Sequence, residues 1–576
     1  MSENTYYITT AIDYVNAAPH LGHAYEKIAT DVMARFQRLC GKEAFFLTGT
    51  DEHGIKVQKT AEGKGVTPKA HCDETAKEFV KAWEYLGITY NRFIRTTDED
   101  HYALVAKMWN TLKDKGLIEK RSYEGLYCPG CEAFKTKRDL TEDGECANHQ
   151  RKPDIVVEEN YFFLITKFKD QIAAHIKANP TFVQPKYRAD EVLGMLEDLQ
   201  DISVSRPKTT VSWGIPVPGD DEQVIYVWID ALSNYITGIG CWKDQELFNK
   251  YWGTTENPNA VHVIGKDILR FHAIYWPAML LAADLPLYKT LFVHGFINLN
   301  DSKISKSVGN VVSPFDLARR FDLPNPDPIR YYLMKVAKFG YDGNFTEDDF
   351  KNVVNADLAN NLGNLLNRTL NMAKKYFDGK VPERPQIVRG NECYFQPFQT
   401  TIEESETFPL RPRVVEQGDD LILEQPVAEL RTTNLDDYGK LERVKRLYSE
   451  FNFQEVCNEV LVEIDEANKF ISDLKPWDLA KNNLTDQLAS VIYSVLDLMR
   501  QCALVLSPIT PALSTNILEQ LGYSGNIEDA RWEHITETSL PAGQLVNLGQ
   551  PILPRLDSEL AGAAKRRASN GLCAFN

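Results

Sequence analysis

The sequence predicts an α/β fold followed by an all-α part. A Rossmann-like doubly wound parallel sheet is interrupted by a cysteine-containing insertion, and an α-helical bundle follows. Strand and helix patterns alternate from residue 5 to about 110 and resume at Val261. Possible metal ligands cluster in the segment between these two parts. Helical periodicity dominates from Phe350 onward.

The first strand and helix place two histidines at their junction. Residues 6–12 are rich in β-branched and aromatic side chains, and apolar residues recur at helical spacing over 22–39. A helix N-terminus offers backbone N–H groups and partial positive charge. His20 and His23 can therefore bind phosphate oxygens there, and Gly22 permits close approach. Polar residues that merely begin a helix are the alternative.

A second candidate phosphate-binding segment lies in the middle of the chain. It follows the predicted strand 291–297 and carries Lys303, Ser305 and Lys306. Flexible ammonium groups can follow a phosphate as charge moves between its oxygens. Together, the histidines and lysines predict two cationic segments that close on the phosphates of ATP, with Mg²⁺ bound to the nucleotide. A solvated lysine loop is the alternative.

The insertion has the ligand spacing of a zinc knuckle. Two short pairs, Cys128 with Cys131 and Cys146 with His149, are separated by a polar loop. Three thiolates and one imidazole complete a tetrahedral shell with no open position. We therefore expect one structural Zn²⁺ that folds a small module, with unliganded thiols as the alternative.

The second half is predicted to be helical over 355–375, 438–472, 484–506 and 511–521. A proline-rich, acidic region at about 379–437 interrupts it, for which disorder and a small β-rich excursion are both open. The two halves of the sheet domain are predicted to span 1–115 and 226–300, with the insertion at 116–225 between them. The lysine loop, with a region expected to contact the stem of an RNA, is predicted at 301–350. The helical domain is predicted at 351–556 and a tail at 557–576.

Composition narrows the class of protein. A chain of 576 residues suggests about three to four domains. No run of 18 apolar residues or basic signal segment is present, and only three of the ten cysteines cluster, so we expect a cytoplasmic protein without a membrane partner. The net charge of −17 argues against a general nucleic-acid binder but permits a local basic face for one RNA.

The two phosphate-binding segments resemble the paired signatures of class I aminoacyl-tRNA synthetases, HIGH and KMSKS. Ile304 replaces methionine in the second signature without removing charge. Further motifs narrow the resemblance to the methionyl-tRNA synthetase family over about 6–378 and 438–556. These motifs are TTAIDYVN at 9–16, GTDEHG at 49–54, VWIDAL at 227–232 and GKDILRFH at 265–272.

The resemblance implies roles for individual residues. Asp51 would bind the methionine ammonium, and the Tyr235 hydroxyl could donate to the sulfur and so help to reject leucine or isoleucine. Leu232 replaces a proline of some members, which puts one pocket wall in doubt. Gly265 and Asp267 would lie near the ATP ribose and His294 near adenine. The pocket for the thioether side chain would be formed by Ile12, Tyr14, Trp228, Ala231, Tyr235, Phe271 and His272.

In the helical domain the resemblance assigns anticodon binding to Asn364, Arg368 and Trp477. Asn364 and Arg368 share one helix face, and Trp477 follows a proline at a helix start. A surface arginine beside a half-buried tryptophan is the alternative. The chain lacks the further oligonucleotide-binding domain that makes some members dimeric, so we expect a monomer.

The resemblance thus implies ATP-dependent activation of L-methionine and its transfer to tRNA(Met). Three alternatives stay open at this point. One is a class I synthetase for isoleucine or valine, although these carry a much larger editing insertion. The others are a non-catalytic tRNA-binding paralogue and a nucleotidyltransferase that does not use RNA.

Overall fold

The computed structural model describes residues 4–128, 133–135, 140–147, 150–299, 302–303, 312–384, 413–417, 420–424 and 439–556. The chain forms two compact units, each built from segments that are distant in sequence. Unit 1 comprises Met1–Ala18, Phe45–Lys81 and Tyr90–Val293. Unit 2 comprises Pro19–Ala44, Ala82–Thr89 and His294–Asn576.

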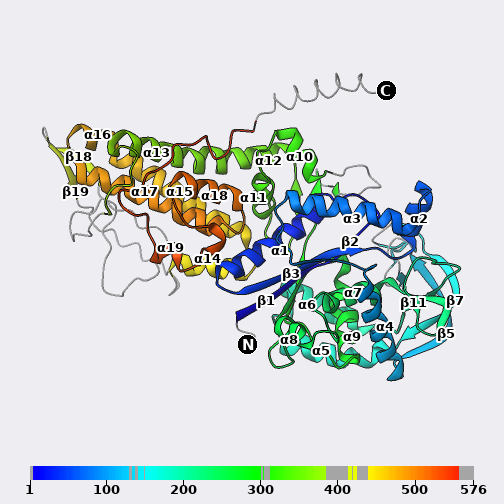
Figure 1. Cartoon of the computed structure of the whole chain (residues 1–576). Coiled ribbons are helices and arrows are strands. Elements are labelled where there is room, and N and C mark those ends of the chain that lie inside the picture. Colours follow the sequence, from blue (N-terminus) through cyan, green and yellow to red (C-terminus); the bar gives the residue numbers. More distant parts are fainter. Residues whose placement is uncertain are drawn as a thin grey trace, which may run out of the picture. The chain divides into compact units, whose positions relative to one another are not determined.

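The predicted parallel sheet is present and has seven strands (Figure 1). Its order is β2-β3-β1-β13-β14-β8, and β4 also pairs with β3. The pairings β1–β13, β14–β8, β2–β3 and β3–β4 are parallel. The strands are β1 (Thr5–Thr10), β2 (Asp13–Tyr14), β3 (Glu43–Asp51), β4 (Arg92–Arg95), β8 (Val183–Gln184), β13 (Ala260–Gly265) and β14 (Thr290–His294).

The first strand lies where the strand order reverses. β1 has β3 on one side and β13 on the other, and every residue of β1 and β13 is buried. Runs that are apolar on both faces suit a parallel sheet covered by helices. Gly49 in β3 is needed because a Cβ there would collide with the Ile94 carbonyl of β4. Residues after β1 and β13 therefore meet at the carboxyl edge, where open α/β sheets bind ligands.

Helices and two small sheets complete unit 1, and α4 packs on α7. The insertion contributes a four-stranded sheet, β6-β5-β7-β9, and a three-stranded sheet, β10-β12-β11. The helices are α2 (Ile55–Lys64), α3 (Pro68–Tyr85, which ends in unit 2), α4 (Glu99–Asp114), α5 (Lys169–Ala178), α6 (Lys186–Glu197), α7 (Val227–Thr237), α8 (Gln245–Trp252) and α9 (Trp276–Ala282). The remaining strands are β5 (Ile118–Cys128), β6 (Ala133–Lys135), β7 (Asp154–Phe163), β9 (Ile202–Ser203), β10 (Ser205–Pro207), β11 (Pro216–Val217) and β12 (Asp220–Ile225).

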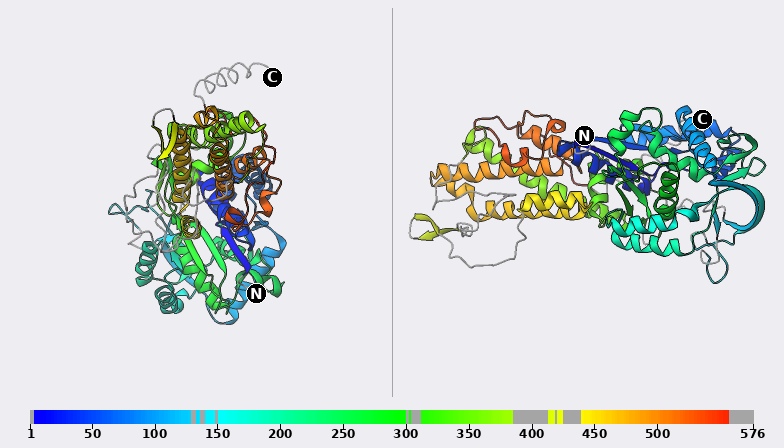
Figure 2. Two further views of the ribbon diagram at one scale, coloured as in Figure 1. Left: turned by 90° about the vertical axis from the view of Figure 1, so that its left-hand side faces the viewer. Right: turned by 90° about the horizontal axis from the view of Figure 1, so that it is seen from below.

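Unit 2 is mainly helical, as predicted, and the long helices α13, α15 and α17 lie side by side (Figures 1 and 2). Three short strands, β15 (Ile297–Leu299), β16 (Ser302–Lys303) and β17 (Gly343–Phe345), form a separate sheet. The helices are α1 (Leu21–Leu39), α10 (Pro314–Phe321), α11 (Asp327–Lys335), α12 (Glu347–Val353), α13 (Asn364–Phe377), α14 (Lys440–Ser449), α15 (Phe453–Leu474), α16 (Pro476–Lys481), α17 (Thr485–Leu506), α18 (Pro511–Gln520) and α19 (His534–Glu537).

A buried arginine fixes α1 within unit 2. The Arg330 guanidinium donates to Asp31 Oδ2 of α1 (2.8 Å) and to the carbonyls of Leu86, Pro508 and Ile509 (3.1, 2.9 and 2.9 Å). Burial alone would raise the pKa of Asp31, but the adjacent arginines and Thr89 lower it to about 2. The helix that begins beside His20 is therefore held near its middle, at Asp31, by a charge-assisted hydrogen bond.

The helical half departs from the expected pattern in three places. The predicted helix 438–472 is two helices, because Phe451 takes a left-handed backbone conformation (φ 58°) between α14 and α15. A π-helical segment, Val354–Gly363, precedes α13. The irregular region contains a hairpin of β18 (Arg413–Gln417) and β19 (Asp420–Glu424), and its other residues beyond 384 lie outside the described part up to 439.

Among the described residues, one helix, α17, is long and apolar enough to cross a membrane. Its most apolar window is 89% buried inside the protein. A buried apolar helix of this kind is the core helix of a bundle.

Candidate functional site

The two histidines at the start of α1 cap the helix reciprocally. The Gly22 N–H donates to His20 Nδ1 (3.1 Å), and the His20 N–H donates to His23 Nδ1 (3.2 Å). Their ring centroids are 3.8 Å apart. Because each Nδ1 accepts a hydrogen bond, the neutral tautomer of each ring carries its hydrogen on Nε2.

Burial keeps both rings neutral. It lowers the pKa of His20 to about 4, and burial together with His20 and Lys27 lowers the pKa of His23 well below its ordinary value. The expectation of a cationic histidine segment is therefore wrong. Near pH 7 both histidines are neutral hydrogen-bond donors, which still suit a phosphate oxygen.

The structure describes the residues on either side of the lysine segment. Lys303 pairs with Asn298 in the β15–β16 hairpin, and after residues 304–311 the chain continues at Val312. The Val312 carbonyl accepts a hydrogen bond from the Leu21 N–H at the start of α1 (3.0 Å). Ser305 and Lys306 lie outside the described residues, so their roles stay predictions. The end of this segment and the histidine pair are neighbours within unit 2.

His294 ends β14 and belongs to a buried cluster on α1. Its Nε2 is 3.0 Å from Glu26 Oε2, and its Nδ1 is 2.7 Å from the Gly295 carbonyl. Lys27 Nζ donates to the other Glu26 oxygen (3.0 Å). Burial would raise the pKa of Glu26, but Lys27 and His294 lower it. Both ring nitrogens of His294 and one oxygen of Glu26 are therefore engaged inside this cluster.

Four of the predicted pocket residues form two contacting pairs in unit 1. The Trp228 and Phe271 rings are stacked at 3.5 Å and 6°. Tyr235 and His272 are buried, and the Tyr235 hydroxyl lies 2.7 Å from His272 Nε2. Trp228, Ala231 and Tyr235 come from α7, and Phe271 and His272 from the π-helical turn Phe271–Tyr275. An aromatic wall with a polar end suits an apolar amino-acid side chain that contains a polarizable atom.

The Tyr235 hydroxyl already has an acceptor. His272 Nδ1 lies 3.0 Å from the Ile268 carbonyl, which can only accept, so Nδ1 carries the hydrogen in the neutral ring. His272 Nε2 is then the acceptor for Tyr235. Donation from Tyr235 to a sulfur atom is therefore not the arrangement found. The two side chains form a buried hydrogen-bonded unit.

Asp51 is the last residue of β3 and is buried. Tyr14 pairs with it between β2 and β3, and the Tyr14 hydroxyl donates to the His53 carbonyl (2.9 Å). Ile12, between β1 and β2, packs partly buried against the core. Gly265 ends β13, and Asp267 follows in an exposed turn at the same edge of the sheet.

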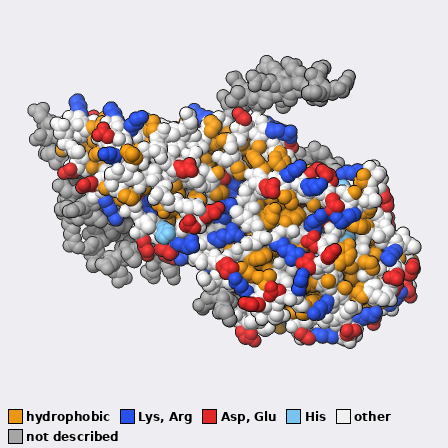
Figure 3. All heavy atoms as spheres, viewed as in Figure 1, with side chains coloured by type: hydrophobic (Ala, Val, Ile, Leu, Met, Phe, Trp, Pro, Cys, Tyr) orange, Lys and Arg blue, Asp and Glu red, His pale blue; other side chains and the backbone are white. Residues whose placement is uncertain are grey.

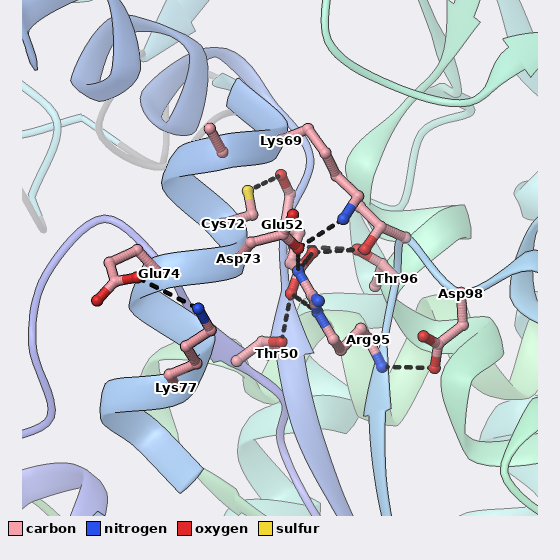
Figure 4. A network of polar contacts seen from close by, with 12 residues as sticks. Thr50, Glu52, Lys69, Cys72, Asp73, Glu74, Lys77, Arg95, Thr96 and Asp98 are labelled. Atoms are coloured by element: carbon pink, nitrogen blue, oxygen red, sulfur yellow. Dashed lines mark hydrogen bonds and ion pairs between the residues drawn. The ribbon is translucent and has the colours of Figure 1, made fainter. Parts of the chain in front are cut away.

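The sequence did not predict the network of hydrogen bonds around Glu52, next to Asp51 (Figure 4). The buried Glu52 carboxylate accepts two hydrogen bonds from Arg95 (2.6 and 2.9 Å) and further ones from Thr50 (2.8 Å) and Thr97 (2.6 Å). Arg95 also bonds Asp73 (2.6 Å). A bidentate pair with saturated oxygens is rigid. The network thus holds the backbone that carries Asp51.

A second buried carboxylate holds α7 beside the same loop. Asp230 accepts from His53 Nδ1 (2.6 Å) with one oxygen and from His101 Nε2 (2.8 Å) with the other. Burial would raise the pKa of Asp230, but the two histidines lower it. The motif that carries Asp230 was recognised, but its two partners lie more than 100 residues away in sequence.

In unit 2, the Arg368 guanidinium on α13 lies 5.4 Å from the ring of Trp477 on α16. Trp477 is 43% exposed, unusually high for a large aromatic residue, and Asn364 at the start of α13 is exposed. A solvent-facing aromatic ring beside a guanidinium can stack on an unpaired base. Acidic and basic side chains are interspersed over the face in Figure 3.

Residues 6–152 and 138–370 match the family model for tRNA synthetases class I (M), and residues 439–552 match that for the anticodon-binding domain of tRNA ligase. A methionine–tRNA ligase of Synechocystis sp. is 40% identical, over 96% of this chain and 98% of that protein. The chain belongs to the methionine–tRNA ligase family.

Other members of the family are also similar to this chain over most of its length. The methionine–tRNA ligase of Clostridium acetobutylicum is 41% identical over 97% of this chain and 79% of its own length. A crystal structure of Mycobacterium tuberculosis methionyl-tRNA synthetase bound by methionyl-adenylate superposes with a TM-score of 0.81 at 34% identity. The superposition covers 96% of this chain and 100% of the chain in the crystal structure.

The predicted zinc site of this family member is only partly described. Cys128 ends β5, Cys146 forms backbone bridges with Leu140 and Arg151, and both side chains are buried. Cys131 and His149 lie outside the described residues. Within the described ranges, no group of three or more His, Cys, Asp or Glu side chains could hold a metal. These two buried thiols are half of the predicted ligand set.

Proposed function

We propose that this chain activates L-methionine with ATP and transfers it to the 3′-terminal adenosine of tRNA(Met), supplying elongator and initiator methionyl-tRNA. The observation that carries the proposal is the similarity to methionine–tRNA ligases over 96% of the chain. The contacting pocket residues Trp228, Phe271, Tyr235 and His272 support methionine as the amino acid.

The reaction has two steps, activation of the amino acid and its transfer to the tRNA. A methionine carboxylate oxygen attacks the α-phosphorus of ATP, a new O–P bond forms, and pyrophosphate leaves with the electron pair of the broken bond. A terminal ribose hydroxyl then attacks the methionyl carbonyl, and AMP leaves. The hydroxyl proton passes to the departing phosphate. No covalent enzyme intermediate is needed, so positioning and charge stabilisation supply the rate.

We assign ATP binding to the two motif segments of unit 2. His20 and His23 would donate from Nε2 to phosphate oxygens as neutral groups, while Lys303 and Lys306 supply positive charge. Mg²⁺ on the nucleotide would neutralise phosphate charge when bound. His294 would contact the adenine, and Gly265 and Asp267 the ribose.

Methionine selection rests on shape and on one hydrogen-bonded pair. Asp51 would bind the ammonium group, and the stacked Trp228–Phe271 wall would contact the thioether. Because the Tyr235 hydroxyl is directed to His272, this pair would define the depth of the pocket instead of donating to sulfur. Aliphatic branched side chains would then be excluded by shape.

RNA selection is assigned to Asn364, Arg368 and Trp477, which would stack on and hydrogen-bond unpaired anticodon bases. One Zn²⁺ held by Cys128, Cys131, Cys146 and His149 would fold the knuckle of the insertion. We further propose that the enzyme acts as a cytoplasmic monomer.

Charging of tRNA(Met) with labelled methionine tests the whole proposal. Methionyl-tRNA should form only with ATP present, and a tRNA with a different anticodon should be charged far more slowly. A protein that binds tRNA(Met) but charges it with no amino acid would be the non-catalytic paralogue instead.

A further inference from the structure

Helix α7 presents two different faces inside unit 1. Trp228, Ala231 and Tyr235, which we assign to the methionine pocket, lie at i, i+3 and i+7 and therefore share one face. Asp230 and Thr237 lie at i and i+7 of the same helix and share a second face. Whatever holds the second face also fixes the rotation and the axial position of the first.

Two histidines from other elements hold the second face of α7. His101 of α4 spans two turns of α7, because its Nε2 lies 2.8 Å from Asp230 Oδ1 and its Nδ1 lies 3.0 Å from Thr237 Oγ1. His53, in the loop after β3, contacts the other carboxylate oxygen, with Nδ1 2.6 Å from Asp230 Oδ2. Asp230 and both histidines are at most 1% exposed. Buried hydrogen bonds to a carboxylate are strong, so they fix the position of α7.

His53 is itself anchored to the strand end that carries Asp51. It lies two residues beyond Asp51, the last residue of β3. Its Nε2 lies 2.9 Å from the Tyr102 hydroxyl of α4, and its carbonyl accepts a hydrogen bond from the Tyr14 hydroxyl (2.9 Å). A connection held by hydrogen bonds therefore runs from Asp51 through His53 to Asp230 on α7.

We propose that His53 and His101 are positioning residues that determine how long an amino-acid side chain the enzyme accepts. The inference rests on the function proposed above, in which Asp51 binds the ammonium group and the pocket face of α7 binds the side chain. The spacing between these two ends is then set by the hydrogen bonds to Asp230. Methionine would fit this spacing, whereas a side chain with one more methylene would require α7 to move away from Asp51.

The test is ATP–pyrophosphate exchange with three amino acids. These are methionine, ethionine, which has one more methylene beyond the sulfur, and norleucine, which has the same length but a methylene in place of the sulfur. Wild-type enzyme should prefer methionine to ethionine about 10- to 200-fold in kcat/KM, the value of one methylene in an apolar pocket. In His53→Ala this preference should fall at least about fivefold, because one of the two contacts that hold Asp230 is lost.

Norleucine separates the length of the side chain from its chemistry. The preference for methionine over norleucine reflects the polarizable sulfur, so in His53→Ala it should stay within about twofold of wild type. His53→Asn keeps an N–H donor close to the position of Nδ1 and should retain most of the preference for methionine over ethionine. His175→Ala, at a partly buried histidine of α5, is the matched control and should leave both preferences unchanged.

A milder variant decides the question if His53→Ala does not fold. Thr237→Val removes the hydroxyl that contacts His101 and should lower the preference for methionine over ethionine about 2- to 10-fold.

An unchanged preference for methionine over ethionine in His53→Ala, or in Thr237→Val where it takes its place, overturns the proposal. An equal loss of kcat/KM with all three amino acids also overturns it, because that result indicates general destabilisation, as would a comparable fall in His175→Ala. The proposed function fails in a different way, since wild-type enzyme would then show no exchange with methionine.

Discussion

His20 and His23 show how hydrogen bonding sets the chemistry of single side chains. Each Nδ1 is occupied by a backbone N–H, and burial lowers both pKa values. The pair therefore offers neutral donors to the phosphate that we propose it binds. On that proposal, the positive charge of the ATP site comes from the lysine segment and the helix N-terminus.

This neutrality predicts a pH dependence of stability. The pKa of His20 falls from 6.5 to about 4 on folding, so between these values the unfolded chain binds a proton that the folded chain does not. Stability should therefore fall as the pH falls through this window. The unfolding free energy of the wild type should fall between pH 7 and pH 5. In His20→Asn, which keeps a capping side chain but has no titrating ring at this position, the fall should be smaller by about 2 kcal/mol. Denaturant titrations at the two pH values measure this, and identical losses would contradict a neutral His20.

Lys306→Ala should greatly slow methionine-dependent ATP–pyrophosphate exchange and leave methionine affinity near normal. The ammonium group would act on phosphate charge that develops during the reaction, so kcat falls and the methionine KM does not. Exchange kinetics with methionine varied at saturating ATP separate the two constants. An unchanged kcat would remove Lys306 from catalysis.

Tyr235→Phe leaves His272 Nε2 without its donor in a buried site. An unsatisfied buried acceptor costs about 1–3 kcal/mol of unfolding free energy. The methionine KM should also rise, because the His272 ring loses the partner that fixes it in the proposed pocket. Tyr161→Phe, which removes a hydroxyl bonded to Asp220 in the insertion, is the control and should leave the KM unchanged. If Tyr235→Phe binds methionine as wild type does, the Tyr235–His272 pair does not shape the pocket.

At the scale of elements, two buried carboxylates next to the pocket hold it together. Glu52 is bonded by Arg95 from β4, and Asp230 of α7 by His53 and His101. These bonds join β3, β4, α4 and α7 within unit 1.

Arg95→Met should leave the buried Glu52 carboxyl group without its bidentate partner. Loss of one partner from a buried pair costs about 3–5 kcal/mol, and the shift of the adjacent Asp51 should raise the methionine KM. Denaturant unfolding and exchange kinetics measure the two effects. Arg121→Met, at a 39% exposed arginine paired with Glu119, should change neither. A fully stable Arg95→Met variant would show that the network is dispensable.

Sequence patterns predicted the elements that obey simple periodicity. The buried strands β1 and β13 and the amphipathic helix α1 follow from their apolar spacing. The π-helical turn that presents Phe271 and His272 was missed because its hydrogen bonds do not alter the apolar pattern. Arg95 and His101 were missed because their partners are set by tertiary packing, which periodicity does not encode.

Across the whole chain, the proposed function assigns amino-acid activation and RNA selection to different residues. Mutations should therefore be able to impair one without the other. Trp477→Ala and Arg368→Ala should each reduce kcat/KM for tRNA(Met) charging about 5- to 150-fold, the value of one stacked base. Both variants should keep wild-type exchange, which involves no tRNA. Lys374→Ala removes an exposed charge from the same helix and should cost much less. Equal losses for Lys374 and Arg368 would indicate general electrostatic attraction instead of base recognition.

Methionyl-adenylate is the first product of the function proposed above. ATP–pyrophosphate exchange without tRNA, measured with methionine, leucine, isoleucine and valine in turn, detects its formation. The kcat/KM for exchange should be at least about 100-fold higher with methionine than with the other three amino acids. Preferential exchange with another amino acid, or none with methionine, would show that this chain does not select methionine.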